Sequence, residues 1–122
     1  MRAIRSKGMK PELAVRKLVH KLGYRFRLHR RDLPGKPDLV FPCRRKVIFV
    51  HGCFWHCHDC KTAHVPKSNQ EYWKPKLQRN CVRDQQNLRN LSLYGWQTAV
   101  IWECETHNAA NLAERLNTFL RD

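Results

Sequence analysis

Lys46-Val-Ile-Phe-Val-His51 is a short and almost entirely apolar run near the middle of the chain. A run of this length that is rich in β-branched residues is typical of a strand covered on both faces of a sheet. Asp38-Leu-Val-Phe41 predicts a second, shorter strand, which follows the turn Leu33-Pro-Gly-Lys-Pro37. The centre of the domain is therefore expected to be a sheet with both faces buried.

Helical and strand patterns flank this centre. A helix is expected over 11–22, because a proline stands at its start, a glycine follows its end and apolar residues recur at helical spacing. Residues 24–29 alternate between apolar and basic, which predicts a half-buried strand. A long helix to about residue 93, kinked or newly begun at Pro75, a strand over 96–103 and a helix over 108–120 complete the pattern. The order α-β-β-β-α-β-α predicts one α/β domain over 1–122, with a mixed central sheet flanked by helices.

The charge is strongly positive and unevenly distributed. The 122 residues include 24 Lys and Arg against 10 Asp and Glu, a formal net charge of +14, and residues 1–37 alone hold 12 basic and 2 acidic residues. Such a field favours a polyanion, and nucleic acid is the commonest one; a solvated basic face without a partner is the alternative. No apolar run approaches the ~20 residues of a membrane helix and no secretory leader is seen, so a cytoplasmic protein without membrane contact is expected.

A loop dense in cysteine and histidine follows the central strand. It reads Cys53-Phe-Trp-His-Cys57-His-Asp-Cys60, and Cys104 stands far away after the last expected strand. Structural zinc takes four such ligands, and a metal would hold a loop that has no core of its own. The candidate ligands are Cys53, His56, Cys57, His58, Cys60 and Cys104, and reduced thiols without metal are the alternative. Cys43 and Cys81 are expected to be packing thiols.

Two carboxylates stand where chemistry could occur. Asp38 begins one strand beside His51 at the end of another, and together they could hold Mg²⁺ and transfer a proton, although each alone fits a structural role. Asp84 falls in the apolar stripe of the long helix and needs a polar partner. An arginine such as Arg27 or Arg83 would make Asp84 structural, whereas a histidine of the Cys/His loop would make it a supporting residue of the site.

Two aromatic pairs stand in polar surroundings, Phe54-Trp55 in the Cys/His loop and Tyr72-Trp73 after it. Filling the core is the ordinary role of such rings. A loop flanked by metal ligands has little room for both rings, and rings set in a basic surface can wedge between base steps and kink a duplex. The pattern leaves both roles open.

Three segments resemble the very short patch repair (Vsr) endonucleases, bacterial nickases that act at T·G mismatches. They are Leu33-Pro-Gly-Lys-Pro-Asp38, Val47-Ile-Phe-Val-His-Gly-Cys-Phe-Trp-His56 and Trp96 through Trp102-Glu-Cys104. The resemblance covers nearly the whole chain and implies a restriction-endonuclease-like fold with a zinc-binding loop and Mg²⁺-dependent hydrolysis. It also implies a bacterial monomer that acts at the nucleoid on double-stranded DNA containing a mismatch, with repair proteins as candidate partners.

The resemblance assigns roles to single residues. Asp38 and the backbone carbonyl of Val50 become Mg²⁺ ligands, His51 and His56 become catalytic histidines, and Glu12 supports the water shell of the metal. The implied zinc ligands are Cys53, His58, Cys60 and Cys104, with Cys57 as the alternative to His58. The implied DNA wedge consists of Phe54, Trp55 and Trp73.

Charge alone supplies a further group of candidates, the arginines expected to contact phosphates. They are Arg25, Arg27, Arg30 and Arg31. A nuclease of the same fold with another target, of restriction or general repair type, and a non-catalytic zinc module that binds DNA remain the alternatives to mismatch nicking. Binding alone requires neither a carboxylate nor two imidazoles, so Asp38, His51 and His56 favour an enzyme.

Overall fold

The structure is a computed structural model that describes residues 11–28, 30, 32–52 and 70–121. Within these residues the chain forms one four-stranded sheet of order β1-β2-β3-β4. The strands are β1 (Arg27–Leu28), β2 (Leu39–Phe41), β3 (Lys46–His51) and β4 (Gln97–Trp102). The first three pair antiparallel and β3 pairs parallel with β4, so the predicted mixed sheet is confirmed.

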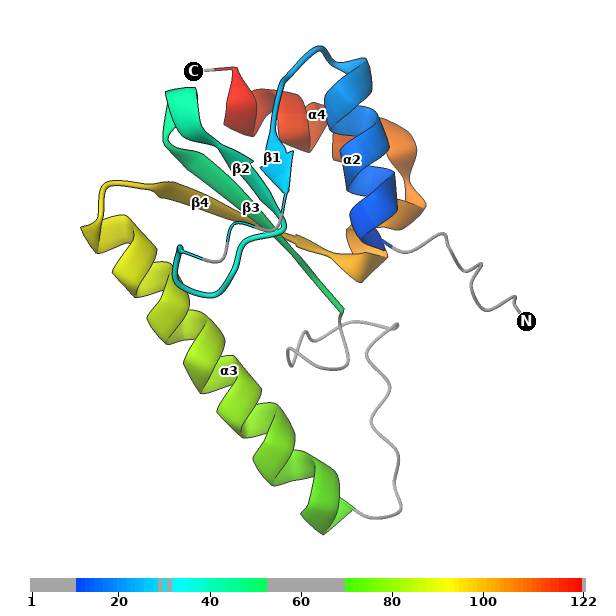
Figure 1. The fold of residues 1–122 in the computed structure, drawn as a ribbon. Helices are drawn as coiled ribbons and strands as arrows, with labels where there is room; N and C mark the ends of the chain where they lie inside the picture. Colours follow the sequence, from blue (N-terminus) through cyan, green and yellow to red (C-terminus); the bar gives the residue numbers. More distant parts are fainter. Residues whose placement is uncertain (1–10, 29, 31, 53–69, 122) are drawn as a thin grey trace.

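Helices cover both faces of this sheet (Figure 1). One face carries α2 (Pro11–Lys21) and α4 (Ala109–Leu120), and the other carries α3 (Gln70–Leu93). The predicted element order is confirmed, with two short 3₁₀ helices added, η1 (Pro42–Arg44) and η2 (Glu103–His107). No described helix combines the length and the apolar composition that crossing a membrane requires.

The apolar strand β3 lies between two hydrophobic cores, as its sequence predicts. Ile48 packs in the core beneath α2 and α4, whereas Val47 and Phe49 pack in the core on the α3 side with Leu91 and Trp96. Neighbouring residues of a strand point to opposite faces, so a strand covered on both sides must be apolar throughout. The two cores fix the position of β3 and therefore of the residues at its end.

The strand at the edge is shorter than predicted. Side chains from Tyr24 to Leu28 alternate between half-buried and exposed, as expected, but Arg27 and Leu28 alone pair with β2. The Tyr24 N–H donates instead to the Val19 carbonyl of α2 at 3.2 Å, so the start of the segment is tied to the helix rather than to the sheet.

The long helix includes Pro75. The alternative prediction, that the helix begins near Pro75, is wrong, because α3 begins at Gln70 and continues past the proline. Proline removes one intrahelical hydrogen bond, and Pro75 is exposed, so water can satisfy the carbonyl that loses its partner.

Candidate active site

Asp38 and His51 meet because β2 and β3 form an antiparallel pair. Asp38 directly precedes β2 and His51 ends β3, and the pairing of Leu39 with Ile48 places both residues at the same end of the hairpin. At the opposite end the chain reverses through η1, where Arg45 adopts the left-handed region (φ 57°) and its N–H donates to the Pro42 carbonyl at 3.2 Å. The tight reversal sets the register that brings Asp38 beside β3.

A backbone hydrogen bond orients the Asp38 carboxylate. The Val50 N–H donates to Asp38 Oδ2 at 2.7 Å, and the Asp38 N–H donates to the Ile48 carbonyl at 3.1 Å. Hydrogen bonds to an ionised acceptor are shorter and stronger than neutral ones. A carboxylate has about four lone-pair positions, so accepting this N–H leaves capacity for a cation.

Aromatic neighbours hold the His51 ring. His51 is 7% exposed, and its ring centroid lies 5.6 Å from that of Phe49 and 5.4 Å from that of Trp102. Trp102 is the residue paired with His51 in the parallel register of β3 and β4. Close packing restricts rotation of the imidazole, and a fixed orientation is what proton transfer to or from a substrate requires.

A cavity of about 220 Å³ joins these two residues to α3. The turn before β2, the end of β3 and one side of α3 form its walls. Its lining includes Gly35, Lys36, Asp38, Val50, His51, Asp84 and Asn87. Asp84, which the sequence pattern places in the apolar stripe of the long helix, thus lines a cavity that also contains polar side chains. Arg27 and Arg83 were the two arginines considered as partners of Asp84. Arg83 donates a hydrogen bond to the side-chain oxygen of Asn80.

The turn before β2 lies tightly against α3. Gly35 has a φ of 77°, and a Cβ at this position would lie 3.0 Å from the Cβ and Nδ2 atoms of Asn87. Glycine is therefore required both by the backbone and by the space. Neither Lys36 nor Asn87 was predicted as a site residue. Asn87 follows Asp84 by three residues, so helical spacing was the signal that could have found it.

The donors in the cavity suit Mg²⁺. This ion takes oxygen ligands, binds through one or two carboxylates and keeps several waters. Asp38 and Asp84 supply carboxylates, and the cavity has room for water. Among the described residues no three His, Cys, Asp or Glu side chains form a ready metal cage, so a cation here would keep much of its water shell.

The predicted zinc site falls mostly outside the described residues. Cys104 is half-buried in η2, whereas Cys53, Cys57, His58 and Cys60 lie outside the described part of the chain. Zinc binding stays a prediction.

The two packing thiols differ from expectation. Cys43 is exposed because the turn of η1 carries it to the surface. Cys81 is half-buried in α3 and is disulfide-bonded.

Glu12 has a local partner in the first turn of α2. Its carboxylate forms an ion pair with Arg16 at 2.6 Å, one helical turn away, and Glu12 is not among the described residues that line the cavity. Its role in a metal water shell stays a prediction. The remaining predicted residues outside the described part of the chain are His56, Phe54, Trp55 and Arg31, and the side chain of Trp73 is likewise not described.

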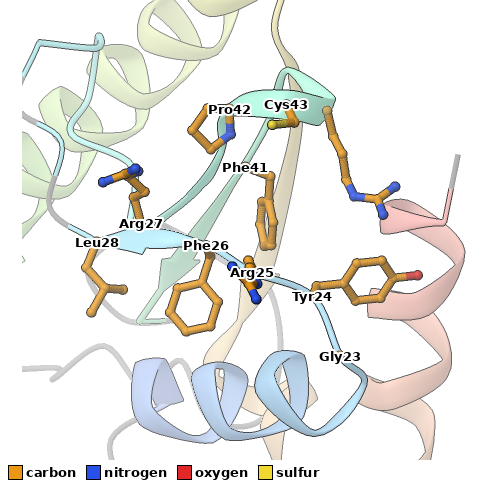
Figure 2. Close-up of a pocket in the computed structure, with 10 residues that line it drawn as sticks. Gly23, Tyr24, Arg25, Phe26, Arg27, Leu28, Phe41, Pro42 and Cys43 are labelled. Carbon is orange, nitrogen blue, oxygen red and sulfur yellow. The ribbon is translucent and has the colours of Figure 1, made fainter.

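Two of the four predicted phosphate-binding arginines border a different concavity. Arg25 and Arg27 are exposed beside a space of about 820 Å³ between β1 and η1, at the other end of the hairpin from Asp38 (Figure 2). Arg30 donates two hydrogen bonds to Asp32, at 3.0 and 2.6 Å. These bonds raise the pKa of Arg30 and lower the pKa of the Asp32 carboxyl, so the pair stays ionised.

Known proteins resemble this chain over nearly its whole length. A family model described as DNA mismatch endonuclease Vsr matches residues 1–62. The type II nicking enzyme V.XorIIP of Xanthomonas oryzae is 53% identical over 120 residues, which are 98% of this chain and 88% of the relative. V.NmeAIP of Neisseria meningitidis, also a type II nicking enzyme, is 43% identical over 122 residues, which are 100% of this chain and 87% of the relative. DNA mismatch endonuclease Vsr of Escherichia coli is 36% identical over 118 residues, which are 97% of this chain and 76% of the relative.

These likenesses agree with the resemblance found in the sequence and with the mixed sheet. They indicate a restriction-endonuclease-like fold and an enzyme that nicks DNA, so the alternative of a non-catalytic zinc module is wrong. DNA is accordingly the polyanion that the basic charge favoured. The chain belongs to the Vsr family of DNA mismatch endonucleases.

Proposed function

We propose that this chain uses Mg²⁺ to hydrolyse one phosphodiester bond at or next to a T·G mismatch, in the cavity between Asp38, His51 and Asp84. The observation that carries the proposal is the Asp38 carboxylate, oriented by the Val50 N–H at 2.7 Å and sharing one cavity with the packed imidazole of His51. An oriented oxygen ligand beside a group that transfers protons suits phosphodiester hydrolysis.

Each residue of the cavity has a role in this proposal. Asp38 and the Val50 carbonyl would hold the ion, which when bound supplies positive charge against the charge that develops on the phosphate. His51 would accept a proton from the attacking water, since its ring is already held by Phe49 and Trp102. Asp84, on the opposite wall, would orient a water or an imidazole. His56 is proposed as the second catalytic histidine.

Recognition of the mismatch is proposed for the aromatic residues of the Cys/His loop and the start of α3. Phe54, Trp55 and Trp73 would enter the duplex, because separating stacked bases costs least where the pairing is already weak. The relative from Escherichia coli is named a mismatch endonuclease, which supports this target. Two other relatives are named type II nicking enzymes, so a nicking enzyme with a different recognition sequence is the second candidate.

A structural zinc ion is proposed to hold the Cys/His loop. Cys53, His58 and Cys60 would be joined by Cys104, which lies in η2 directly after β4. Tetrahedral cysteine and histidine coordination would tie the loop to the end of the sheet. Cys57 is the alternative to His58.

A nicking assay tests the proposal. Matched, T·G and other mismatched duplexes, each labelled on one strand or the other, are incubated with the full chain in Mg²⁺ and in EDTA. We expect a nick in one strand of the T·G duplex, in Mg²⁺ alone. Equal nicking of the matched duplex would favour the second candidate, and activity in EDTA would refute the role of Mg²⁺.

A further inference from the structure

The cavity at the end of the hairpin contains more negative than positive groups. Asp38 and Asp84 are both acidic, and Lys36 is the only lysine or arginine among the described residues that line it. A phosphodiester is itself anionic, so its approach to two carboxylates is unfavourable unless cations neutralise the charge. A metal at Asp38 would supply one such cation, and Lys36 is placed to supply another.

Lys36 has an unusual backbone conformation. Its φ is 52°, in the left-handed region that residues other than glycine rarely adopt. Its position just before Pro37 narrows the available conformations further. The Lys36 N–H donates to the Leu33 carbonyl at 3.1 Å, which closes the turn around this conformation. Strained backbone positions that the surrounding structure maintains are found preferentially at functional sites.

The surrounding structure does maintain this turn. Gly35 lies so close to Asn87 of α3 that a Cβ would not fit at ordinary contact distance. On the other side, Asp38 is bound to the backbone of β3. The turn is therefore held from both ends, with Lys36, an exposed side chain, between its two contacts.

We propose that Lys36 binds a non-bridging oxygen of the DNA phosphate that enters this cavity, and that the left-handed turn exists to place it there. The inference rests on the proposed function, since it assumes that the phosphate enters between Asp38 and Asp84. An ammonium group contributes charge and up to three hydrogen-bond donors and makes no planar contact. Its role is to hold the phosphate for attack and to offset the carboxylates.

The test compares Lys36→Met, Lys36→Arg and Lys36→Gly with the wild type on the T·G duplex. Lys36→Met should lower the single-turnover nicking rate about 10²- to 10³-fold, the range typical of losing one donor to a reacting oxyanion. Lys36→Arg should restore most of that loss, because it returns the charge. The slope of log affinity against log salt should fall by about 0.9 in Lys36→Met, as expected for one lost phosphate contact.

Lys36→Gly separates the charge from the backbone. Glycine adopts positive φ without strain, so this variant should melt no lower than the wild type while nicking as slowly as Lys36→Met. Lys21→Met is the matched control, because Lys21 is also exposed but lies in the last turn of α2 and does not line the described cavity. This control should keep the wild-type nicking rate.

The outcomes separate the inference from the proposed function. If Lys36→Met nicks within twofold of the wild type while Asp38→Ala is inactive, the inference is wrong and the proposed function stands. If the wild type nicks no duplex, the proposed function is wrong, and the salt slope of binding still decides whether Lys36 contacts a phosphate. A rate loss that Lys36→Arg does not restore, with an unchanged salt slope, would also overturn the inference.

Discussion

Replacing Asp38 by Asn and by Ala distinguishes its proposed metal binding from its structural hydrogen bond. Asn keeps a side-chain oxygen that can accept from the Val50 N–H, whereas Ala leaves that half-buried amide without its 2.7 Å acceptor. Losing such an acceptor costs about 1–2 kcal/mol of unfolding free energy. In a domain of this size each kcal/mol lowers the melting temperature by about 3–6 °C. Asp38→Ala should therefore melt roughly 3–12 °C below the wild type, and Asp38→Asn close to it.

Nicking should respond differently from stability. Both variants remove the charged ligand, so both should lose at least about 10²–10³-fold in the single-turnover rate on a T·G duplex with Mg²⁺. Binding measured in EDTA should be retained or slightly tighter, because one negative charge has been removed beside the phosphate. The three readouts are the nicking rate, the duplex affinity and the melting temperature of the same preparations.

Two results would refute this account of Asp38. Nicking by Asp38→Asn within tenfold of the wild type would show that the charged carboxylate is not needed as a metal ligand. Equal melting temperatures for Asp38→Asn and Asp38→Ala would show that the hydrogen bond from Val50 does not stabilise the hairpin end.

Lys46→Met should lower the free energy of unfolding by about 1.5–3 kcal/mol in chemical denaturation, because the Nζ of the buried Lys46 donates to the Phe119 carbonyl at 2.5 Å. The nicking rate of this variant, measured well below its melting temperature, should not change. Cys104→Ala should lose zinc in metal analysis, and a wild type that contains no zinc would contradict the proposed site. Trp55→Ala should lower the mismatch-to-match affinity ratio, whereas a lower melting temperature with an unchanged ratio would indicate a core ring. Arg25→Glu should weaken binding to matched and mismatched duplexes about equally, and wild-type affinity should fall on the order of a thousandfold between 50 and 200 mM salt for about six phosphate contacts.

The centre of the fold could be predicted because the pattern that defines it lies within one short segment of sequence and its neighbour. β3 is apolar at successive positions, and this pattern alone requires cover on both faces, which α3 on one side and α2 with α4 on the other provide. Its short separation from β2 favours a hairpin, and a hairpin brings Asp38 to His51. The core of the candidate site thus follows from neighbouring segments.

The opposite wall of the cavity could not be predicted in the same way. The contact between Gly35 and Asn87 joins a turn to a helix about fifty residues later. The apolar stripe of α3 indicates which face of the helix is buried, but no spacing in the sequence reports which turn packs beside that face. Asp84 stands out in the sequence as a carboxylate within an apolar stripe, but the cavity that accommodates it depends on this long-range contact. The Glu12–Arg16 pair is the reverse case, since its spacing of four residues on a helix favours a local ion pair.

The basic charge serves the fold as well as the DNA. Arg44 and Lys46 donate to the last carbonyls of α4, at 2.8 and 2.5 Å, where the negative end of the helix dipole favours cations. Arg45 lies 4.7 Å over the Trp96 ring and donates to the Tyr94 carbonyl. These three consecutive cations each have an intramolecular partner, so their presence in the net charge does not make them phosphate contacts. The salt slope counts the counterions released on binding, and it should therefore be much smaller than the formal charge of +14 would suggest.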